Sequence, residues 1–233
     1  MKIVISGYGR MGHEIESIAM QRGHEIVATI DTFKDWNNLP DCDVIIDFTT
    51  AKAAPEIAKI AFSKGIAFVS GTTGWNDKLN EIKQLAETEG KTFFYASNFS
   101  IGANIFFNIN KKLASFLGKN ENYKAEVHEV HHIHKKDAPS GTAITLAEDI
   151  ISDSNLYTHW TSKADENGLL ITSERIGEVP GIHIVEWKSS NDSIQIKHEA
   201  FNRKGLALGA VIAAEWVIGK SGVYGMSDLL STD

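Results

Sequence analysis

The chain has 233 residues, 42% of them hydrophobic and 23% charged, a balance typical of a globular protein large enough for two small domains. Its net charge of -7 argues against a nucleic-acid partner, and the sequence lacks an apolar run long enough to span a membrane. The single cysteine, Cys42, excludes an intrachain disulfide, and no signal-peptide core is present, so we expect a cytoplasmic protein.

Residues 1–100 alternate between short apolar runs and helical patterns. The expected strands are 2–6, 25–30, 44–48, 66–70 and 92–96, and the expected helices are 12–22, 53–64 and 77–89. Gly23 and Gly65 follow two of these helices, where glycine commonly ends a helix. Strands that alternate with helices predict an α/β fold, with a doubly wound parallel sheet covered on both faces.

The pattern changes after residue 100. We expect helices at 101–117 and 142–151, a mobile polar loop at 153–168, and strands at 124–130, 169–176, 183–189 and 193–200 in a more antiparallel sheet. The last helix, 207–218, is apolar enough to pack on the first domain. The sequence therefore predicts a Rossmann-type dinucleotide-binding domain (1–100 plus 204–233), with an α+β substrate domain (101–203) inserted into it.

A glycine-rich turn follows the first expected strand and opens the first expected helix. Gly7, Gly9 and Gly12 give the pattern G-x-G-x-x-G. The first glycine permits a tight turn, the second a close approach to pyrophosphate, and the third close packing of helix on strand. The alternative is a glycine-rich turn without a ligand.

Asp31 ends the second expected strand about 20 residues after the last glycine, where an acid accepts hydrogen bonds from the adenosine ribose. Thr32 and Phe33 follow it and Lys34 lies near, so little positive charge adjoins this carboxylate. A 2′-phosphate would be disfavoured there, and we expect NADH rather than NADPH. The alternative is an acid that merely ends a strand.

A second turn, Gly71-Thr72-Thr73-Gly74, lies at the carboxyl end of the fourth expected strand. Open α/β sheets bind their ligands at this edge. The backbone and the two hydroxyls can hold the nicotinamide side of a dinucleotide, although such a segment is also common as an ordinary turn.

The block from Glu129 to Thr142 concentrates histidines and lysines and ends in Pro139-Ser140-Gly141-Thr142 ahead of an expected helix. Clustered histidines can bind zinc, but this block has no nearby thiols and no clear set of carboxylates, so we expect no metal. A solvated basic loop without a ligand is a second alternative to a substrate site. The helix N-terminus and Lys135 favour an anion, and a histidine is the usual general acid or base. The block therefore indicates reduction of a carboxylated substrate with proton transfer.

These residues resemble those of the dihydrodipicolinate reductase (4-hydroxy-tetrahydrodipicolinate reductase) family of the diaminopimelate route to lysine, and the resemblance extends over essentially the whole chain. The matching segments occur in the family's order, and the last of them is the most specific: residues 9–12, 47–49, 71–74, 96–100 and 129–143. The resemblance implies an NAD(P)H-dependent reductase that acts on a small dicarboxylate and forms a homotetramer through its second domains.

The resemblance also implies roles for individual residues. His131 matches the proton donor/acceptor and Lys135 the second proton donor. Substrate contacts are implied for His132, Ser140, Gly141, Thr142 and Arg203. Cofactor contacts are implied for Gly7, Tyr8, Gly9, Arg10, Met11, Gly12, Asp31, Gly71, Thr72, Thr73, Ala96, Ser97, Asn98 and Phe99.

Three departures from the family pattern concern the cofactor. The glycine fingerprint is one residue shorter than usual and carries Tyr8 where small residues are common. The connection from Asp31 to Asp43 is brief, so a helix often found there should be missing. Thr50 stands where many relatives carry arginine.

Two other functions are compatible with a two-domain nicotinamide-binding plan. One is another amino-acid-pathway dehydrogenase, similar to aspartate or homoserine dehydrogenase, but it leaves the block from His131 to Thr142 unexplained. The other is a non-enzymatic nicotinamide-sensing protein, which would bind cofactor without turnover.

Overall fold

The computed structural model describes residues 1–32, 36 and 38–231, and the chain forms two compact units. The first is Met1–Ile101 with Arg203–Asp233, and the second is Gly102–Asn202. The expected boundaries lie one residue away from these, so Arg203 falls in the first unit. Phe33, Lys34 and Asn37 lie outside the described residues. They belong to the connection from Asp31 to Asp43, where we expect no helix.

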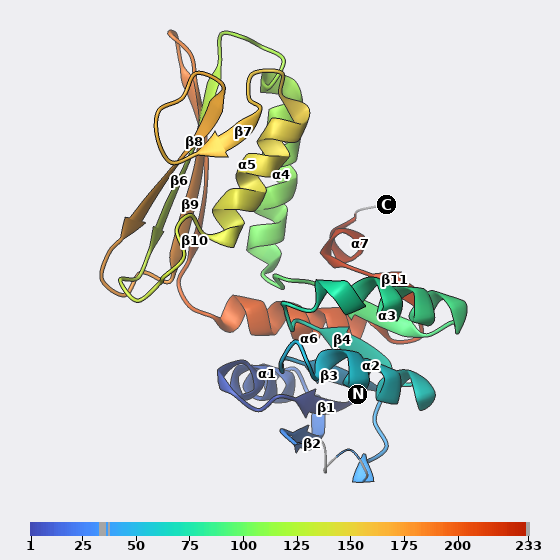
Figure 1. Cartoon of the computed structure of the whole chain (residues 1–233). Helices are drawn as coiled ribbons and strands as arrows, with labels where there is room; N and C mark the ends of the chain where they lie inside the picture. The colour runs from blue at the N-terminus through green and yellow to red at the C-terminus, as the bar shows by residue number, and fades with distance from the viewer. Residues whose placement is uncertain (33–35, 37, 232–233) are drawn as a thin grey trace. The chain divides into compact units, whose positions relative to one another are not determined.

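The first unit contains a sheet of six described strands in the order β11-β5-β4-β3-β1-β2, all parallel (Figure 1). Its strands are β1 Lys2–Ser6, β2 Glu25–Ile30, β3 Val44–Asp47, β4 Ala67–Ser70, β5 Thr92–Tyr95 and β11 Gly222–Tyr224; its helices are α1 Arg10–Gln21, α2 Ala54–Ser63, α3 Asn76–Thr88, α6 Lys204–Val217 and α7 Met226–Leu230. The expected doubly wound sheet is confirmed. The short β11 and α7 were not expected.

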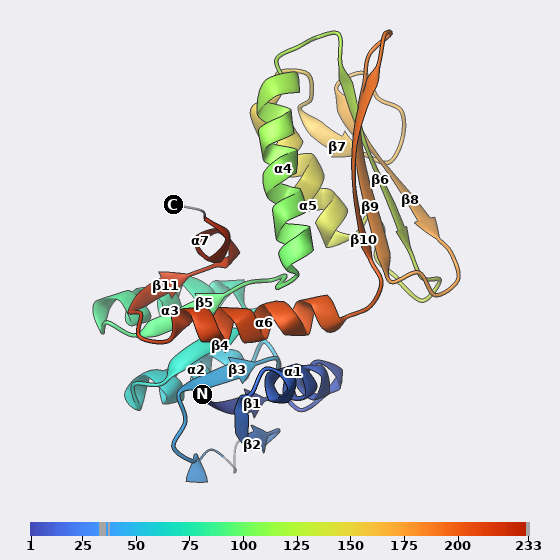
Figure 2. The ribbon, with the colours of Figure 1, turned by 180° about the vertical axis from the view of Figure 1, so that it is seen from behind.

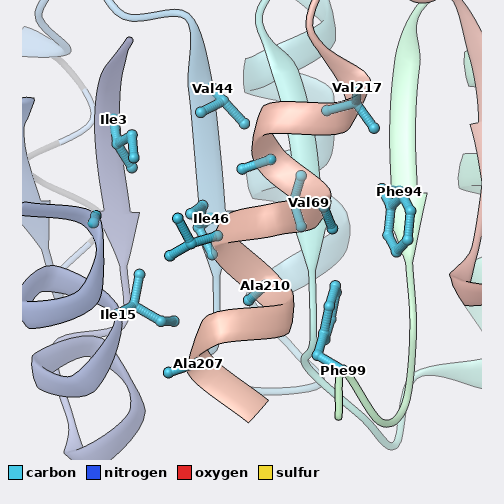
Figure 3. Close-up of a cluster of buried hydrophobic side chains, with 14 of the residues drawn as sticks. Ile3, Ile15, Val44, Ile46, Val69, Phe94, Phe99, Ala207, Ala210 and Val217 are labelled. Atoms are coloured by element: carbon cyan, nitrogen blue, oxygen red, sulfur yellow. The ribbon is translucent and has the colours of Figure 1, made fainter. Parts of the chain in front are cut away.

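Alternation along each central strand divides the core of this unit between two faces. In β3, Val44 and Ile46 pack on one face while Ile45 packs on the other. The first face is covered by α1 and α6, whose Ala207 and Ala210 lie against the strands (Figure 3). The second is covered by α2 and α3. Helix α6 therefore returns the chain to the first unit, as its apolar composition predicts.

The second unit contains a sheet of five described strands in the order β10-β9-β6-β8-β7. Its strands are β6 Lys124–His131, β7 His159–Thr161, β8 Gly168–Arg175, β9 Gly181–Lys188 and β10 Ser193–Ala200; its helices are α4 Ile101–Leu117, which starts at the last residue of the first unit, and α5 Gly141–Asp153. Both helices lie on the same face of this sheet, and no helix of the unit covers the other face (Figures 1 and 2). The expected α+β unit is confirmed.

Two details of the second sheet differ from the sequence-based expectation. Strand β9 is antiparallel to β6 and β10, but β8 is parallel to both β6 and β7, so the sheet is mixed. Strand β7 lies inside the segment expected to be a mobile polar loop. It forms because Trp160 packs against the core of this unit, and three residues are too few to show an alternating pattern.

Burial raises the pKa of Cys42 to about 11, with Asp41 and Asp43 adding to the shift, so its thiol stays protonated at neutral pH. Among the described residues, no helix combines the length and the apolar character needed to cross a bilayer.

Candidate functional site

The glycine fingerprint forms the turn between β1 and α1. Gly7 has a φ of +86°, and a Cβ there would lie 2.3 Å from the carbonyl oxygen of Phe48. A Cβ at Gly12 would lie 2.4 Å from the carbonyl oxygen of Gly7, so only glycine lets the helix start this close to the strand. Gly9 precedes α1 without a side-chain cap and has no atom within 4 Å of its Cβ position.

The uncapped start of α1 and the space beside Gly9 fit a pyrophosphate bound at the helix N-terminus. Arg10 and Met11 are the first residues of that helix, and Tyr8 precedes Gly9. The side chain of Asp31 is exposed at the end of β2, and its Oδ1 accepts a hydrogen bond of 2.6 Å from the backbone N–H of Tyr8. The ribose acid predicted from the sequence therefore lies directly beside the fingerprint.

The turn after β4 lies against the end of β3. A Cβ at Gly71 would lie 2.3 Å from the ring of Phe48, and Thr72 is buried while Thr73 is exposed. The hydroxyl of Thr72 donates to Asp47 at 2.7 Å and accepts from the N–H of Thr49 at 2.8 Å. The two turns are thus tied together by side-chain hydrogen bonds.

Segment 96–99 follows β5 at the same edge of the sheet. The N–H of Ala96 donates to the carbonyl of Ser70, and the Phe99 ring is buried, 5.8 Å from the ring of Phe48. Ser97 is exposed and Asn98 half-buried. All the expected cofactor segments therefore lie at the carboxyl ends of β1, β2, β4 and β5.

A row of polar side chains crosses the second sheet on the face that carries α4 and α5. In register, Val127 of β6 pairs with Val185 and Ile171. Two residues further along, Glu129 pairs with His183 of β9 and Ser173 of β8, and then His131 pairs with Arg175. The apolar core thus ends where the polar row begins.

Glu129 and His131 form the centre of this row, and both are buried. One carboxylate oxygen of Glu129 accepts from Nη2 of Arg175 at 2.9 Å and from the N–H of Ser140 at 3.3 Å. The other lies against Nδ1 of His131 as an ion pair. Burial lowers the pKa of His131; Glu129 opposes this shift, and Lys135 and Arg175 add to it.

His183 joins the row to the start of α5. Its Nε2 lies 3.1 Å from Oγ of Ser140, which caps the helix by accepting from the N–H of Ala143. Burial, with the nearby His131 contributing, lowers the pKa of His183 to about 3, so its imidazole is neutral at physiological pH. Ser140 is therefore an internal cap, whereas Gly141 is exposed and Thr142 half-buried.

The loop after β6 carries the remaining residues of the predicted block. Lys135 is half-buried, and its Nζ contacts both carboxylate oxygens of Asp137, at 2.9 and 2.7 Å. His132 is half-buried, while the exposed His134 pairs with Glu178 at 3.1 Å. Only His131 of the three histidines belongs to the polar row.

Arg203 lies in the first unit, where it is the exposed residue that precedes α6. The other residues expected to contact substrate, from His132 to Thr142, belong to the second unit.

Glu129, His131 and His183 each offer a ligand atom within 4.8 Å of the others, a set that can hold a metal ion. The Arg175 guanidinium already neutralises this carboxylate and would repel a cation. The geometry favours a charge-paired acid–base site over a metal centre.

Sequence reasoning did not assign Glu129, Arg175 and His183 as site residues. Their signal was the two-residue period of the expected strands, because each shares a face with apolar residues such as Val127, Ile171 and Val185. A charged residue on the buried face of a strand needs a partner, and here the partners are on neighbouring strands.

A doubly wound sheet with a glycine fingerprint, joined to a separate unit with a buried acid–base row, defines a Rossmann-type oxidoreductase of two domains. Comparisons with known proteins narrow this class. The family model described as dihydrodipicolinate reductase, N-terminus, matches residues 1–99, and the one described as dihydrodipicolinate reductase, C-terminus, matches residues 102–230. The chain belongs to the dihydrodipicolinate reductase family.

Similar proteins cover the chain from end to end. The 4-hydroxy-tetrahydrodipicolinate reductase of Christiangramia forsetii is 44% identical over 234 residues, covering 99% of this chain and 98% of the relative. That of Archaeoglobus fulgidus is 36% identical over 261 residues, covering 99% of this chain and 100% of the relative. A solved structure, dipicolinate-bound dihydrodipicolinate reductase from Paenisporosarcina sp. TG-14, has the same fold: TM-score 0.82, 22% identity and 99% coverage of each chain.

Proposed function

We propose that this chain reduces 4-hydroxy-tetrahydrodipicolinate to tetrahydrodipicolinate with NADH or NADPH, in the diaminopimelate route to lysine in the cytoplasm. The observation that carries this proposal is the 44% identity, over nearly the whole of both chains, to a relative of that name. The paired Glu129 and His131 support it, because the reaction requires a proton donor.

The reaction balances with one hydride and one proton. The substrate loses its hydroxyl group as water and leaves a carbon–carbon double bond. A reduced nicotinamide, held by the glycine fingerprint and the 71–74 turn, would supply a hydride to one carbon of that bond and would itself be oxidised. His131 supplies the one net proton to the other carbon. Lys135, the second proton donor, protonates the hydroxyl group as it leaves as water and regains the proton that the neighbouring carbon loses.

The start of α5 is suited to bind a substrate carboxylate. The N–H of Ala143 is bonded to the Ser140 cap, but Gly141 has no atom within 4 Å of its Cβ position, which leaves space for a carboxylate beside the first turn of the helix. Thr142 and His132 supply further polar groups, and Lys135 supplies positive charge. Ser140 contributes by capping the helix, and Arg203 would contact the substrate from the first unit.

The assay measures NADH oxidation with the condensation product of pyruvate and aspartate semialdehyde. We expect His131→Ala and Lys135→Ala each to lower kcat by about 10²- to 10⁴-fold, the usual contribution of a positioned acid or base. The Kd for NADH should stay within about twofold, because neither residue lies in the first unit. His134→Ala, an exposed histidine of the same block, is the matched control and should keep full activity.

Normal turnover in both variants would contradict this mechanism. NADH binding without turnover in the unaltered protein would instead favour a nicotinamide-sensing protein.

NADH is the proposed preferred cofactor. The Asp31 carboxylate beside the fingerprint would repel a 2′-phosphate, and it accepts a hydrogen bond from the N–H of Tyr8. Asp31→Asn keeps an acceptor for that bond and removes the charge. We expect kcat/KM for NADPH to rise about tenfold relative to NADH, which corresponds to about 1.4 kcal/mol.

Asp77→Asn, the same change at an exposed site in the first turn of α3, should leave the cofactor ratio unaltered. An unchanged ratio in Asp31→Asn would remove this residue from cofactor selection.

We also propose a homotetramer assembled through the second units. The uncovered face of the second sheet supports this assembly (Figures 1 and 2).

A further inference from the structure

Glu129 is a fully buried carboxylate in the centre of the second sheet. Burial raises its pKa, but the Ser173 hydroxyl and the guanidinium of Arg175 outweigh this effect, and the net pKa lies below the usual range. The group is therefore ionised at neutral pH. A buried charge of this kind is costly unless its partners are fixed.

Three elements fix the Glu129 carboxylate. Arg175 of β8 donates to it through Nη2, and the same nitrogen donates to the carbonyl of Asp137 at 2.6 Å. Ser140, the cap of α5, donates its N–H to the same carboxylate oxygen. The second oxygen is left to face Nδ1 of His131.

The opposite side of the His131 ring faces Gly181 of β9. A Cβ on Gly181 would lie 3.1 Å from Nε2 of His131, so the absence of a side chain there keeps Nε2 clear of a neighbour. The two ring nitrogens thus have different surroundings: one faces a carboxylate, and the other faces a glycine.

We propose that Glu129 is a positioning residue for the reaction, which holds the proton on Nδ1 of His131 and makes Nε2 the nitrogen that gives its proton to the substrate. This inference rests on the proposed reductase activity. Arg175 acts through Glu129, because it fixes the orientation of the carboxylate. A ring held in this way resembles the general arrangement in which one acid orients a catalytic histidine through its second nitrogen.

The charges around His131 fit this role. Glu129 on the same strand raises its pKa, whereas Lys135 in the next loop and Arg175 on β8 lower it; His183 on β9 is neutral. Without substrate the imidazole is neutral. A dicarboxylate would add negative charge and favour the imidazolium, whose Nε2–H proton goes to the substrate carbon next to the one that receives the hydride. The ring is then neutral again, with its proton on Nδ1.

Nitrogen-15 NMR of histidine-labelled full-length protein tests the tautomer without substrate, with His131→Asn used to assign the signal. We expect neutral His131 to carry its proton on Nδ1 in the unaltered protein. In Glu129→Gln we expect the preference for Nδ1 to be lost. A proton on Nε2 in the unaltered protein would overturn the proposal, and this measurement stands even where Glu129→Gln does not fold.

Kinetics give the second readout. We expect Glu129→Gln to lower kcat about 100-fold, with KM for the substrate within about twofold. Loss of the carboxylate charge lowers the pKa of His131, so the fall of kcat at high pH should begin at lower pH. Glu129→Asp keeps the charge on a shorter side chain and should restore part of kcat and the original pH profile.

Glu148→Gln is the matched control, because Glu148 is exposed on α5, and it should leave kcat and the pH profile unchanged. Unaltered kcat and pH profile in Glu129→Gln would refute the positioning role. Lack of turnover in the unaltered protein would refute the proposed function instead, while the tautomer measurement would still decide the role of Glu129.

Discussion

Asp47 shows how one buried residue can organise the sheet edge at which the cofactor is expected. Its carboxylate is completely buried and accepts hydrogen bonds from the hydroxyls of four residues at the ends of three parallel strands: Ser6 at 3.1 Å, Thr49 at 2.7 Å, Ser70 at 2.9 Å and Thr72 at 2.7 Å. Burial raises its pKa, and these donors oppose the shift. Asp47 therefore connects β1, β3 and β4 directly beneath the fingerprint and the 71–74 turn.

We expect Asp47→Asn to destabilise the first unit by about 2–3 kcal/mol, because the NH2 group that replaces one carboxylate oxygen cannot accept from the two hydroxyl donors that face it. KM for NADH should rise as well, since the loops it connects include the expected cofactor contacts. Urea unfolding and steady-state kinetics measure the two effects. The surface change Asp41→Asn is the control and should stay within about 0.5 kcal/mol. Unchanged stability in Asp47→Asn would show that this network is energetically neutral.

At the scale of elements, α1 and α6 are joined by Glu215. Its carboxylate accepts hydrogen bonds from Nε and Nη2 of Arg22, at 2.8 and 2.7 Å, and lies 2.6 Å from Nε2 of His24. The hydrogen bond from Arg22 lowers the pKa of Glu215 more than any other interaction does, and burial partly opposes this shift. A lowered folded-state pKa stabilises the fold above the unfolded value near 4.5 and loses this effect as pH falls through the folded value.

We therefore expect Glu215→Gln to lower the free energy of unfolding by about 1 kcal/mol at pH 7, a small value because the pair is partly exposed. The difference from the unaltered protein should shrink as pH falls below about 4.5. Denaturant unfolding at several pH values measures both quantities. Glu87→Gln, at an exposed position of α3, should show neither effect, and a constant difference across pH would contradict the ion-pair origin.

Long helices and strands were predictable from the sequence, because burial of one face places apolar residues at regular intervals along many positions. The predicted helix 101–117 has the bounds of α4, and strand 193–200 has those of β10. The strands β7 and β11 have three residues each, which is too short for such a pattern to be recognised. For the candidate site, His131 and Lys135 are predictions from the sequence, whereas the pairing of Glu129 with Arg175 depends on strand register, which the order of residues does not reveal.

At the scale of the molecule, the second sheet has one face without a helical cover. Residues of its central strands that point away from α4 and α5 include Val130 of β6 with Ile182 and Ile184 of β9, and the last two are half-buried. Polar residues such as Glu126, His128 and Glu186 share this face, so the apolar side chains form a small patch on it, which the same face of a second chain would cover. This arrangement underlies the proposed homotetramer.

We expect Ile184→Arg to break the proposed tetramer into smaller species without unfolding the chain, because the substitution would place a charge in the proposed sheet interface while the core on the helical face stays intact. Sedimentation velocity measures the size, and circular dichroism measures the retained fold. Met20→Arg places the same charge on an exposed residue of α1 in the first unit and should keep four chains together. A tetramer that persists in Ile184→Arg would move the interface to another surface, whereas an unaltered protein that sediments as one chain would show that this sheet face is stable in water uncovered.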